Sequence, residues 1–342
     1  MAHCNYRPAV VPIFVPRAGA KGPAPVGLEE PGGERLRVAG IEQFGGALKT
    51  LVLPDPRTPR EGEVLIEVRA AGVGNWDDIV RTGNWDVGGT SPMALGVEAA
   101  GVVAAVGTGA GNWSLGDEVL THPVPLAGQG TWAPLLTAQA THLARKPADV
   151  SWAHAGPFPV PALTAIQVLD DYLRLRPGEQ LLVNGAGSVT GGLIVSLAVL
   201  REVHVLATAG PASRGRVIRA GAATVVDYHD PEWPAQILDA TGGRGVDAAA
   251  NAAQSGVAKA LATVREGGRL ATITSDPPEP ERGIDVVSVY VRSVASQLEV
   301  ASRALAAGRL VFELGARFQL AQADAALERA NASLGGAVVL EL

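Results

Sequence analysis

Three glycines stand where an apolar strand, 181–183, is followed by a predicted helix, and their spacing points to phosphate binding. Gly185, Gly187 and Gly191 form a GxGxxxG pattern. Glycine permits a tight turn and a close approach of backbone to ligand. The N–H groups that open a helix lack internal partners, and with the helix dipole they attract an anion. The pattern therefore predicts a bound dinucleotide, with pyrophosphate contacts at Gly185, Gly187, Ser188 and Val189.

The end of the next predicted strand indicates which dinucleotide is bound. An NAD site usually places Asp or Glu there, where the carboxylate accepts hydrogen bonds from the ribose. Here Thr208 is followed by Ala, Gly and Pro, and then by Arg214, while Tyr228 closes the following strand. A guanidinium matches a phosphate in charge and in geometry, and such a bond contributes about 1.5–3 kcal/mol. We therefore expect NADPH, with Thr208, Arg214 and Tyr228 at its ribose end; the alternative for Arg214 is a solvated helix residue.

A dinucleotide site of this kind is formed by strands that alternate with helices. Predicted strands at 181–183, 203–208, 223–228, 246–251 and 269–274 are separated by helical segments, which favours a doubly wound parallel sheet over residues 156–292. Alternating and short apolar runs over 35–155 favour a mostly β domain. Residues 293–342, with a helix at 294–307 and a strand at 337–342, are expected to return to that first domain. Residues 1–34 are rich in Pro, Gly and Ala and predict an irregular extension.

Composition excludes several classes of protein. The chain has 342 residues, a formal charge of −6 and a single cysteine, Cys4. The acidic balance argues against a nucleic-acid partner, and one cysteine permits neither an intrachain disulfide nor a cysteine-rich zinc knuckle. No apolar run approaches the roughly 18 residues of a membrane span, and no secretory signal is evident. We expect a cytoplasmic protein with no membrane partner.

Several motifs occur in a consistent order along the chain: IEQFGG (41–46), EVLIEVRAAGV (63–73), ALGVEAAGVVAAVG (94–107), GDEV (116–119), GAGSVTG (185–191), VVDYHD (225–230) and GGRLATI (267–273). From residue 35 onward the chain resembles the medium-chain dehydrogenase/reductase superfamily, in its zinc-independent quinone oxidoreductase and enoyl reductase branch. The resemblance implies an α/β fold in which a GroES-like β domain accompanies a doubly wound Rossmann domain, with the active site between them.

Zinc can be tested against the resemblance. Zinc-dependent relatives carry Cys and His at the positions of Gly74 and Val97, and they have a four-cysteine lobe that is absent here. Glu98 remains, but one carboxylate does not hold the metal. We expect no metal site, so alcohol oxidation, which uses Lewis-acid polarisation, is a poor match. A substrate activated by its own conjugation, such as an enone or a quinone, fits better.

The resemblance also implies positions for site residues. Thr164, Asn251, Ile273 and Thr274 match the nicotinamide end of the family's cofactor site; the alternatives are a helix Thr bonded to its own backbone and strand ends without ligand contact. Asn75, Trp76, Asp77 and His122 are catalytic candidates, although a structural role for Asp77 is favoured and a lone loop histidine is usually structural. Trp76, Trp85 and Trp132 are expected to form the substrate pocket; for Trp76 and Trp85 the alternative is a place in the protein core. Many relatives have Asn at the position of Gly74.

These inferences favour an NADPH-dependent reductase of α,β-unsaturated carbonyl compounds, with a polyketide-like substrate as one option. An NADPH:quinone reductase is the second hypothesis, and a non-catalytic NADPH-binding protein is the third. No residue stands out as the proton donor, and solvent remains an option. The resemblance further implies a homodimer, for which VVSVYVRS (286–293) is a candidate edge strand.

Overall fold

The structure is a computed structural model, and it describes residues 35–333 and 335–342. The predicted extension at 1–34, with Cys4, lies outside the described residues. Three sheets form the described part of the chain, and two of them are mainly antiparallel. The third is wholly parallel and has the strand order β11-β10-β9-β12-β13-β14. The predicted α/β fold, a GroES-like domain with a Rossmann domain, is confirmed.

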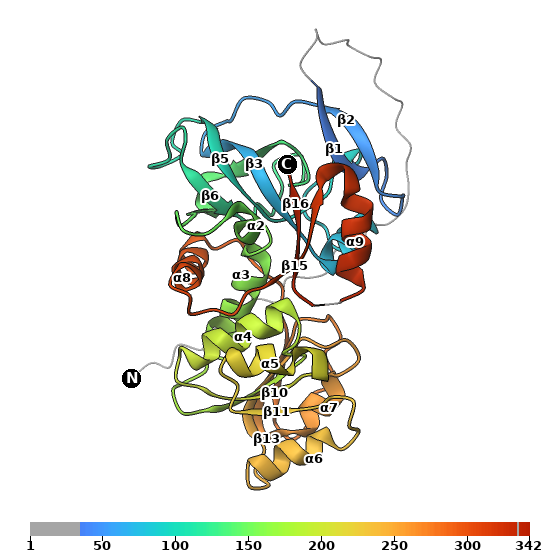
Figure 1. Ribbon diagram of the computed structural model, residues 1–342, viewed down its shortest axis with the longest axis vertical. Coiled ribbons are helices and arrows are strands. Elements are labelled where there is room, and N and C mark those ends of the chain that lie inside the picture. The colour runs from blue at the N-terminus through green and yellow to red at the C-terminus, as the bar shows by residue number, and fades with distance from the viewer. Residues whose placement is uncertain (1–34, 334) are drawn as a thin grey trace, which may run out of the picture. The chain divides into compact units, whose positions relative to one another are not determined.

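The parallel sheet contains the strands predicted from the apolar runs (Figure 1). Its members are β9 (Gln180–Asn184), β10 (His204–Thr208), β11 (Thr224–Val226), β12 (Val246–Asn251), β13 (Val264–Thr272) and β14 (Asp285–Ser288). Side chains alternate between its faces. Leu181 and Val183 pack into one apolar cluster, and Leu182 packs into another. Burial on both faces explains why these strands are continuously apolar.

Helices cover both faces of this sheet. One cluster contains residues of α3 (Pro159–Gln167), α4 (Val189–Val199), α5 (Pro211–Arg219) and α8 (Ala295–Ala306). The other contains residues of α6 (Trp233–Ala240) and α7 (Val257–Ala262). A five-residue π-helical turn, η2 (Val168–Tyr172), continues α3. α3 starts with Pro159, since proline is tolerated in a first helical turn.

The remaining strands form the two mainly antiparallel sheets. The smaller contains β1 (Arg35–Ile41), β2 (Lys49–Pro54) and β4 (Met93–Ala94). The larger contains β3 (Glu63–Val73), β5 (Ala99–Val106), β6 (Glu118–Thr121), β7 (Leu135–Gln139), β8 (Leu143–Arg145), β15 (Leu314–Gln319) and β16 (Ala337–Glu341). Their accompanying helices are α1 (Asn75–Arg81), α2 (Trp152–Ala155), α9 (Ala323–Asn331) and the short turns η1 (Ala140–His142) and η3 (Leu320–Gln322).

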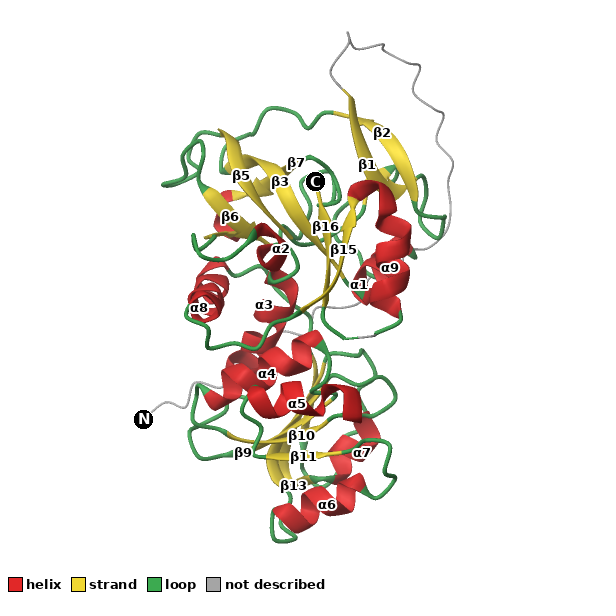
Figure 2. Cartoon of the chain, in the orientation of Figure 1, coloured by secondary structure: helices red, strands yellow, loops and turns green. Residues whose placement is uncertain are grey.

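The C-terminal segment lies beside the central strand of the larger sheet (Figure 2). β16 runs antiparallel to β3, with Val338 opposite Val73, and β15 pairs with the other side of β16. This pairing brings the glycines before β16 close to the start of α1.

One predicted strand is shorter than expected. The apolar run at 286–293 forms a strand only as far as Ser288, and residues 289–294 have no regular structure. Val289, Tyr290 and Val291 instead line a large cavity. Among the described helices, none combines the length and apolarity that crossing a bilayer requires.

Candidate functional site

One cavity of about 970 Å³ brings together most of the residues singled out in the sequence. It extends from the glycine turn after β9 to the residues around the start of α1. Predicted residues that line it are Asn75, Trp76, Trp85, Thr164, Gly185, Gly187, Ser188, Val189, Thr208, Tyr228, Ile273 and Thr274. Because these come from both the parallel sheet and the β-rich part of the chain, the cavity lies where the two meet.

The glycine turn has the tight backbone that its sequence predicted. Gly185 has a φ of +82°, and a Cβ there would lie 2.9 Å from the backbone of Ala252. A Cβ at Gly187 would lie 2.4 Å from the Ser213 hydroxyl. Ser188 caps α4 by accepting a hydrogen bond from the Gly191 N–H at 3.0 Å. The turn fits a phosphate group, since Gly185 and Gly187 line the cavity without side chains.

A buried polar side chain stands at or near the carboxyl end of each of the four central strands. They are Thr208, Asn184, Asn251 and Thr272, each at most 2% exposed. The Gly185 N–H donates to the Thr208 hydroxyl at 2.9 Å, and that hydroxyl donates to Asn184 Oδ1 at 2.7 Å. Asn184 Nδ2 then donates to Asn251 Oδ1 at 2.8 Å. The glycine turn is thus tied to the middle of the sheet.

The chain of hydrogen bonds continues toward the far side of the cavity. Asn251 Nδ2 donates to the hydroxyls of Thr272 and Thr274 at 3.1 and 3.0 Å. Both hydroxyls in turn donate to the Asp276 carboxylate. Thr274 and Ile273 line the cavity, whereas Asn251 is buried behind its wall. Asn251 therefore positions Thr274 instead of facing the cavity as the resemblance implied.

The predicted ribose end carries exposed aromatic surface. Tyr228 is 50% exposed, and its ring centroid lies 4.1 Å from that of His229. Both face Gly210, where a Cβ would lie 3.0 Å from the His229 ring and 3.2 Å from the Tyr228 hydroxyl. Asp227 holds the His229 ring through a 2.7 Å contact to Nδ1. Because Gly210 has no side chain, the rings of Tyr228 and His229 can lie directly beside the start of α5.

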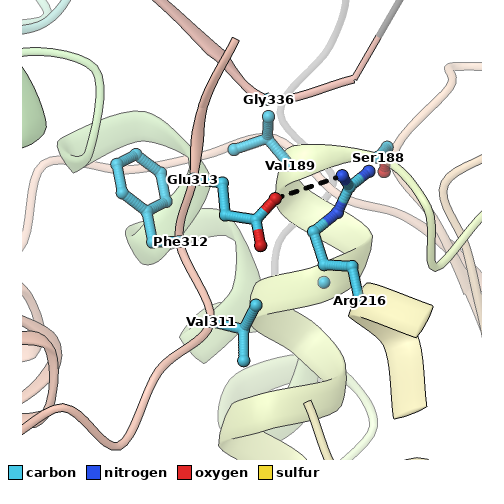
Figure 3. A pocket seen from close by; sticks show the side chains of 8 residues that line it. Ser188, Val189, Arg216, Val311, Phe312, Glu313 and Gly336 are labelled. Carbon is cyan, nitrogen blue, oxygen red and sulfur yellow. Dashed lines mark hydrogen bonds and ion pairs between the residues drawn. The ribbon is translucent and has the colours of Figure 1, made fainter. Parts of the chain in front are cut away.

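The arginine at this end of the cavity is not the one predicted. Arg214 donates to the carbonyl oxygen of Val225 at 2.6 Å and does not line the cavity. Arg216 lines it instead, donating to the carbonyl oxygen of Gly187 at 2.7 Å. Its contact with Glu313, at 3.4 Å, lies in a second, smaller pocket that Arg216 also lines (Figure 3). Each residue of a helix is rotated by about 100° about the helix axis, so residues two apart point in nearly opposite directions. This geometry corrects the assignment of Arg214.

The inner end of the cavity is built around Gly74 and Trp76. A Cβ at Gly74 would lie 2.1–2.4 Å from atoms of the Trp76 indole ring, so the ring lies directly against the glycine. Trp76 Nε1 is buried and has no hydrogen-bond partner. Asn75 and Trp85 also line this end. The indole therefore occupies the space next to the position where many relatives carry Asn.

Thr164 agrees with both interpretations made from the sequence, a residue at the cofactor site and a helix threonine bonded to its own backbone. Its hydroxyl donates to the Val160 carbonyl oxygen at 2.8 Å, which is the local backbone bond of a helix threonine. The residue nonetheless lines the cavity while 8% exposed.

Two carboxyl groups are buried near this inner end. Burial raises the pKa of Asp77 to about 8, although its Oδ2 accepts a hydrogen bond from the Gly74 N–H at 2.8 Å. Burial, with the nearby Asp77 carboxyl adding to it, raises the pKa of Glu98 well above its usual range. Glu98 lines the cavity, but Asp77 does not. Asp77 therefore holds the start of α1, in agreement with the structural role favoured from the sequence, and it does not face a substrate.

His122 agrees with the structural role that is usual for a lone loop histidine, whereas the expectation for Trp132 needs correction. His122 is fully buried, its Nδ1 lies 2.7 Å from the Val97 carbonyl oxygen, and burial lowers its pKa to about 4. It is neutral near pH 7 and faces the core, so it does not supply a proton to the cavity. Trp132 is also fully buried, and its Nε1 donates to the Gly72 carbonyl oxygen at 2.9 Å. It belongs to the core instead of the pocket wall.

The cavity also includes residues that sequence reasoning did not place there. Tyr290, Ser275 and Gln254 line it, as do residues 335–338 before and within β16. Gly335 and Gly336 both have positive φ values, and this glycine pair was the available signal for a turn that approaches the site. Nothing in the local sequence placed it beside the start of α1, because that proximity arises from the pairing of β16 with β3.

The donor set of the described residues does not fit a zinc ion. Over 35–333 and 335–342, no three His, Cys, Asp or Glu side chains are grouped so that they could hold a metal. At the inner end of the cavity, Glu98 stands beside Gly74, which offers no donor side chain. These described residues therefore offer no set of ligands for zinc.

Comparisons with known proteins agree with this architecture. Residues 60–148 match the family model of the alcohol dehydrogenase GroES-like domain, and residues 220–334 match that of the zinc-binding dehydrogenases. Erythronolide synthase EryA2 of Saccharopolyspora erythraea is 34% identical over 70% of this chain. Pikromycin polyketide synthase component PikAII of Streptomyces venezuelae is 32% identical over 66% of this chain. In each case the aligned part spans only 6% of the synthase.

Solved structures match over most of both chains. An NAD-dependent alcohol dehydrogenase has a TM-score of 0.81 and 28% identity, over 90% of this chain and 99% of that one. A mycobacterial quinone oxidoreductase has a TM-score of 0.75 and 25% identity, over 90% of this chain and 100% of the other.

Proposed function

Because this chain belongs to the medium-chain dehydrogenase/reductase superfamily, we propose that it is an NADPH-dependent reductase. In this proposal it transfers a hydride to an α,β-unsaturated carbonyl compound and uses no zinc. The observation that carries the proposal is the single cavity that joins the glycine turn to an inner end walled by Trp76 and Trp85. One end fits a dinucleotide, and the other offers flat apolar surface to a conjugated substrate.

The preference for NADPH rests on the residues near the end of β10. The described residues that line the cavity there are Thr208, Gly210, Pro211, Ala212, Ser213, Arg216, Tyr228 and His229, and none of them is acidic. An acidic side chain would select NAD by accepting hydrogen bonds from the ribose and repelling a phosphate. A cationic Arg216 at the rim instead favours the additional phosphate of NADPH.

Metal-free chemistry fits the inner end of the cavity. NADPH supplies a hydride when it is bound, and a conjugated substrate accepts it at the β-carbon while charge develops on the carbonyl oxygen. The protein then needs to position the substrate, exclude water and stabilise that oxygen. Trp76, Trp85 and Thr164 would position the substrate, while the glycine turn and Thr274 would hold the dinucleotide.

The likeness to polyketide synthase components supports a thioester-linked or otherwise apolar enone as the substrate. The likeness to a quinone oxidoreductase supports a quinone as the second candidate, because a quinone is flat and conjugated in the same way. The third hypothesis, an NADPH-binding protein without turnover, is motivated by Gly74 standing where many relatives have Asn.

Calorimetric titration with NADPH and NADH, followed by turnover assays, separates these hypotheses. We expect NADPH to bind at least tenfold more tightly than NADH, and we expect it to be oxidised in the presence of crotonyl-N-acetylcysteamine thioester or cyclohexenone. Faster oxidation with menadione would favour the quinone reductase. Tight NADPH binding without turnover on any of these compounds would favour the non-catalytic protein, and stronger NADH binding would contradict the cofactor assignment.

A further inference from the structure

We propose that Glu98 is the proton donor of the reduction, an inference that rests on the proposed function. In its neutral form the carboxyl group donates a hydrogen bond to the substrate's carbonyl oxygen. It passes the proton to that oxygen as the hydride reaches the β-carbon. Glu98 is thereby assigned as a catalytic residue on the floor of the cavity.

The position of Glu98 is fixed by contacts with two elements, β3 and α3. Its side chain lies over Gly72 of β3, where a Cβ would come within 2.1 Å of Oε1, so the carboxyl fits only because position 72 is glycine. Its Oε2 accepts a hydrogen bond from the Val160 N–H, in the first turn of α3, at 2.7 Å. The residue is 1% exposed and lines the cavity together with Gly74 and Thr164.

The two oxygens of this carboxyl have different surroundings. Oε2 has its partner in Val160, whereas Oε1 is buried without any partner among the described residues. A buried polar atom without a partner costs roughly 1–3 kcal/mol, so its persistence in a cavity wall favours a ligand that completes it. A protonated Oε1 offers an O–H donor, and a carbonyl oxygen is the group that such a donor binds.

The surroundings also favour the neutral form of the acid. Asp77 on α1 is the titratable group that faces Glu98, and a negative charge on either one disfavours a charge on the other. β3 presents Gly72, which has no side chain, and α3 presents the Val160 N–H. The start of α3 favours the charged form, but complete burial outweighs this effect and raises the pKa of Glu98.

Other groups are less suited to the role. His122 is buried, its pKa is lowered to about 4, and it carries no spare proton near neutral pH. Asp77 is also buried, but its Oδ2 is bonded to the Gly74 N–H and the residue does not line the cavity. Among these titratable groups, Glu98 alone is both at the cavity and suited to being neutral.

The proposed step balances as follows. The hydride that bound NADPH would supply, leaving NADP⁺, forms a C–H bond at the β-carbon. The electrons of the C=C bond then form a new double bond to the carbonyl carbon, and the electrons of the C=O bond move onto oxygen. That oxygen takes the proton of Glu98 and leaves a carboxylate, so the first product is an enol, which becomes the ketone or thioester by tautomerisation. Water that refills the cavity after product release returns a proton to Glu98.

The test compares the wild type with Glu98→Gln, which keeps the shape and a donor but has no proton to transfer. Turnover of crotonyl-N-acetylcysteamine thioester with NADPH is measured as a function of pH, and infrared spectra of the unliganded proteins are recorded near neutral pH. We expect the variant to lose about 100-fold in kcat with little change in KM. We also expect the wild-type kcat to fall at high pH, the variant to lack this fall, and one carboxylic-acid C=O band to be missing from its spectrum.

Thr137→Val is the matched control, because Thr137 has a buried hydroxyl without a partner but lies on β7 and does not line the cavity. It is expected to keep the wild-type kcat and the wild-type pH profile. If Glu98→Gln fails to fold, infrared spectra of Asp77→Asn decide, because Asp77 is the other buried acid whose pKa is raised. A spectrum of Asp77→Asn without a carboxylic-acid C=O band near neutral pH overturns the proposal. A variant with wild-type kcat and pH profile overturns the role of Glu98 and leaves the proposed function intact. A wild type that reduces no enone overturns both.

Discussion

Two missing side chains shape the inner end of the cavity. Gly72 and Gly74 follow the two-residue period of an extended strand, and a Cβ on either would overlap its neighbour, Glu98 or Trp76. The two glycines therefore do more than permit a turn, since they make room for the carboxyl and the indole that face the cavity. Even a small side chain at either position is therefore expected to displace Glu98 or Trp76.

Gly74→Ala tests this packing. The new methyl group would lie 2.1 Å from the Trp76 ring, although the backbone at position 74 is extended and suits alanine. We expect a loss of about 1–3 kcal/mol in the free energy of unfolding, together with a changed tryptophan fluorescence spectrum, both measured in urea titrations. Gly215→Ala on α5 is the control, because the nearest atom there is 3.7 Å away. Equal effects at the two positions would contradict the packing argument.

His122 provides a test through the pH dependence of stability. Its folded-state pKa is about 4, below the ordinary value of 6.5. The unfolded chain therefore binds more protons between these values, and the stability that neutral His122 contributes is present above pH 6.5 and lost as the pH falls toward 4. We expect His122→Gln to show a shallower loss of unfolding free energy over this interval than the wild type. A loss as steep as that of the wild type would show that His122 is not the group responsible.

Residue types were easier to predict than side-chain directions. Gly185, Gly187 and Ser188 were placed correctly at the cavity because backbone geometry gives them their position. Arg214 and Trp132 were expected at the site because their chemistry fits it, but helix phase and burial direct them elsewhere. His122, for which a structural role was favoured, is buried as well. Glu98 was considered as a metal ligand in the sequence, and only its burial and the nearby Gly72 reveal a different role.

At the level of elements, the ends of the parallel strands are coupled. Thr208 on β10 accepts from the Gly185 N–H and donates to Asn184 on β9, so one hydroxyl links the glycine turn to the next strand. Because every donor in this chain points toward Asp276, the hydrogen bonds can strengthen one another. The turn is thereby held before a ligand arrives.

Thr208→Val tests the coupling, because valine keeps the shape and removes the hydroxyl. The change leaves the Gly185 N–H and Asn184 Oδ1 without this partner. Each such group costs roughly 1–3 kcal/mol, and water partly offsets this cost. We therefore expect NADPH binding to weaken about tenfold. Calorimetric titration measures the dissociation constant. Thr208→Ser restores the hydroxyl and should recover most of the affinity. If serine and valine weaken binding equally, the hydroxyl is not the cause.

The elements themselves were largely predictable, because strands buried on both faces are continuously apolar and glycine or proline marks their ends. β12 coincides with the expected strand at 246–251, and α8 lies within one residue of its expected limits. β14 was overestimated, since the apolar residues at 289–291 line the cavity and do not continue the strand. An apolar pattern alone does not distinguish residues that continue a buried strand from residues that line a cavity.

At the scale of the whole molecule, the sheet order depends on contacts between distant segments. β16 lies beside β3, and Glu313 just before β15 is contacted by Arg216 and Arg219 of α5. No local signal predicts such pairing, so the sequence predicts that residues 293–342 return to the first domain but not which strand they join. The domain limits at residues 155 and 292 remain predictions, and limited proteolysis would test them.

The expected homodimer is also tested at this scale. β14 is the last strand of the parallel sheet in its described part, so its outer N–H groups are available to a second copy. Val289 donates inward to β13, and alternation therefore directs the Ser288 N–H outward. We expect the wild type to sediment as a dimer and Ser288→Pro to dissociate it without lowering the melting temperature. A wild type that is monomeric at all concentrations would contradict the edge-to-edge dimer.

The most direct test of the central claim is the oxidation of NADPH by the metal-free protein in the presence of a conjugated carbonyl compound. The protein is treated with a chelator, its zinc content is measured, and the absorbance of the reduced nicotinamide is followed with crotonyl-N-acetylcysteamine thioester. We predict turnover that is the same before and after chelation and much faster with NADPH than with NADH. Activity that disappears with zinc and returns on its addition would contradict the account, as would a protein that oxidises NADPH with no conjugated substrate.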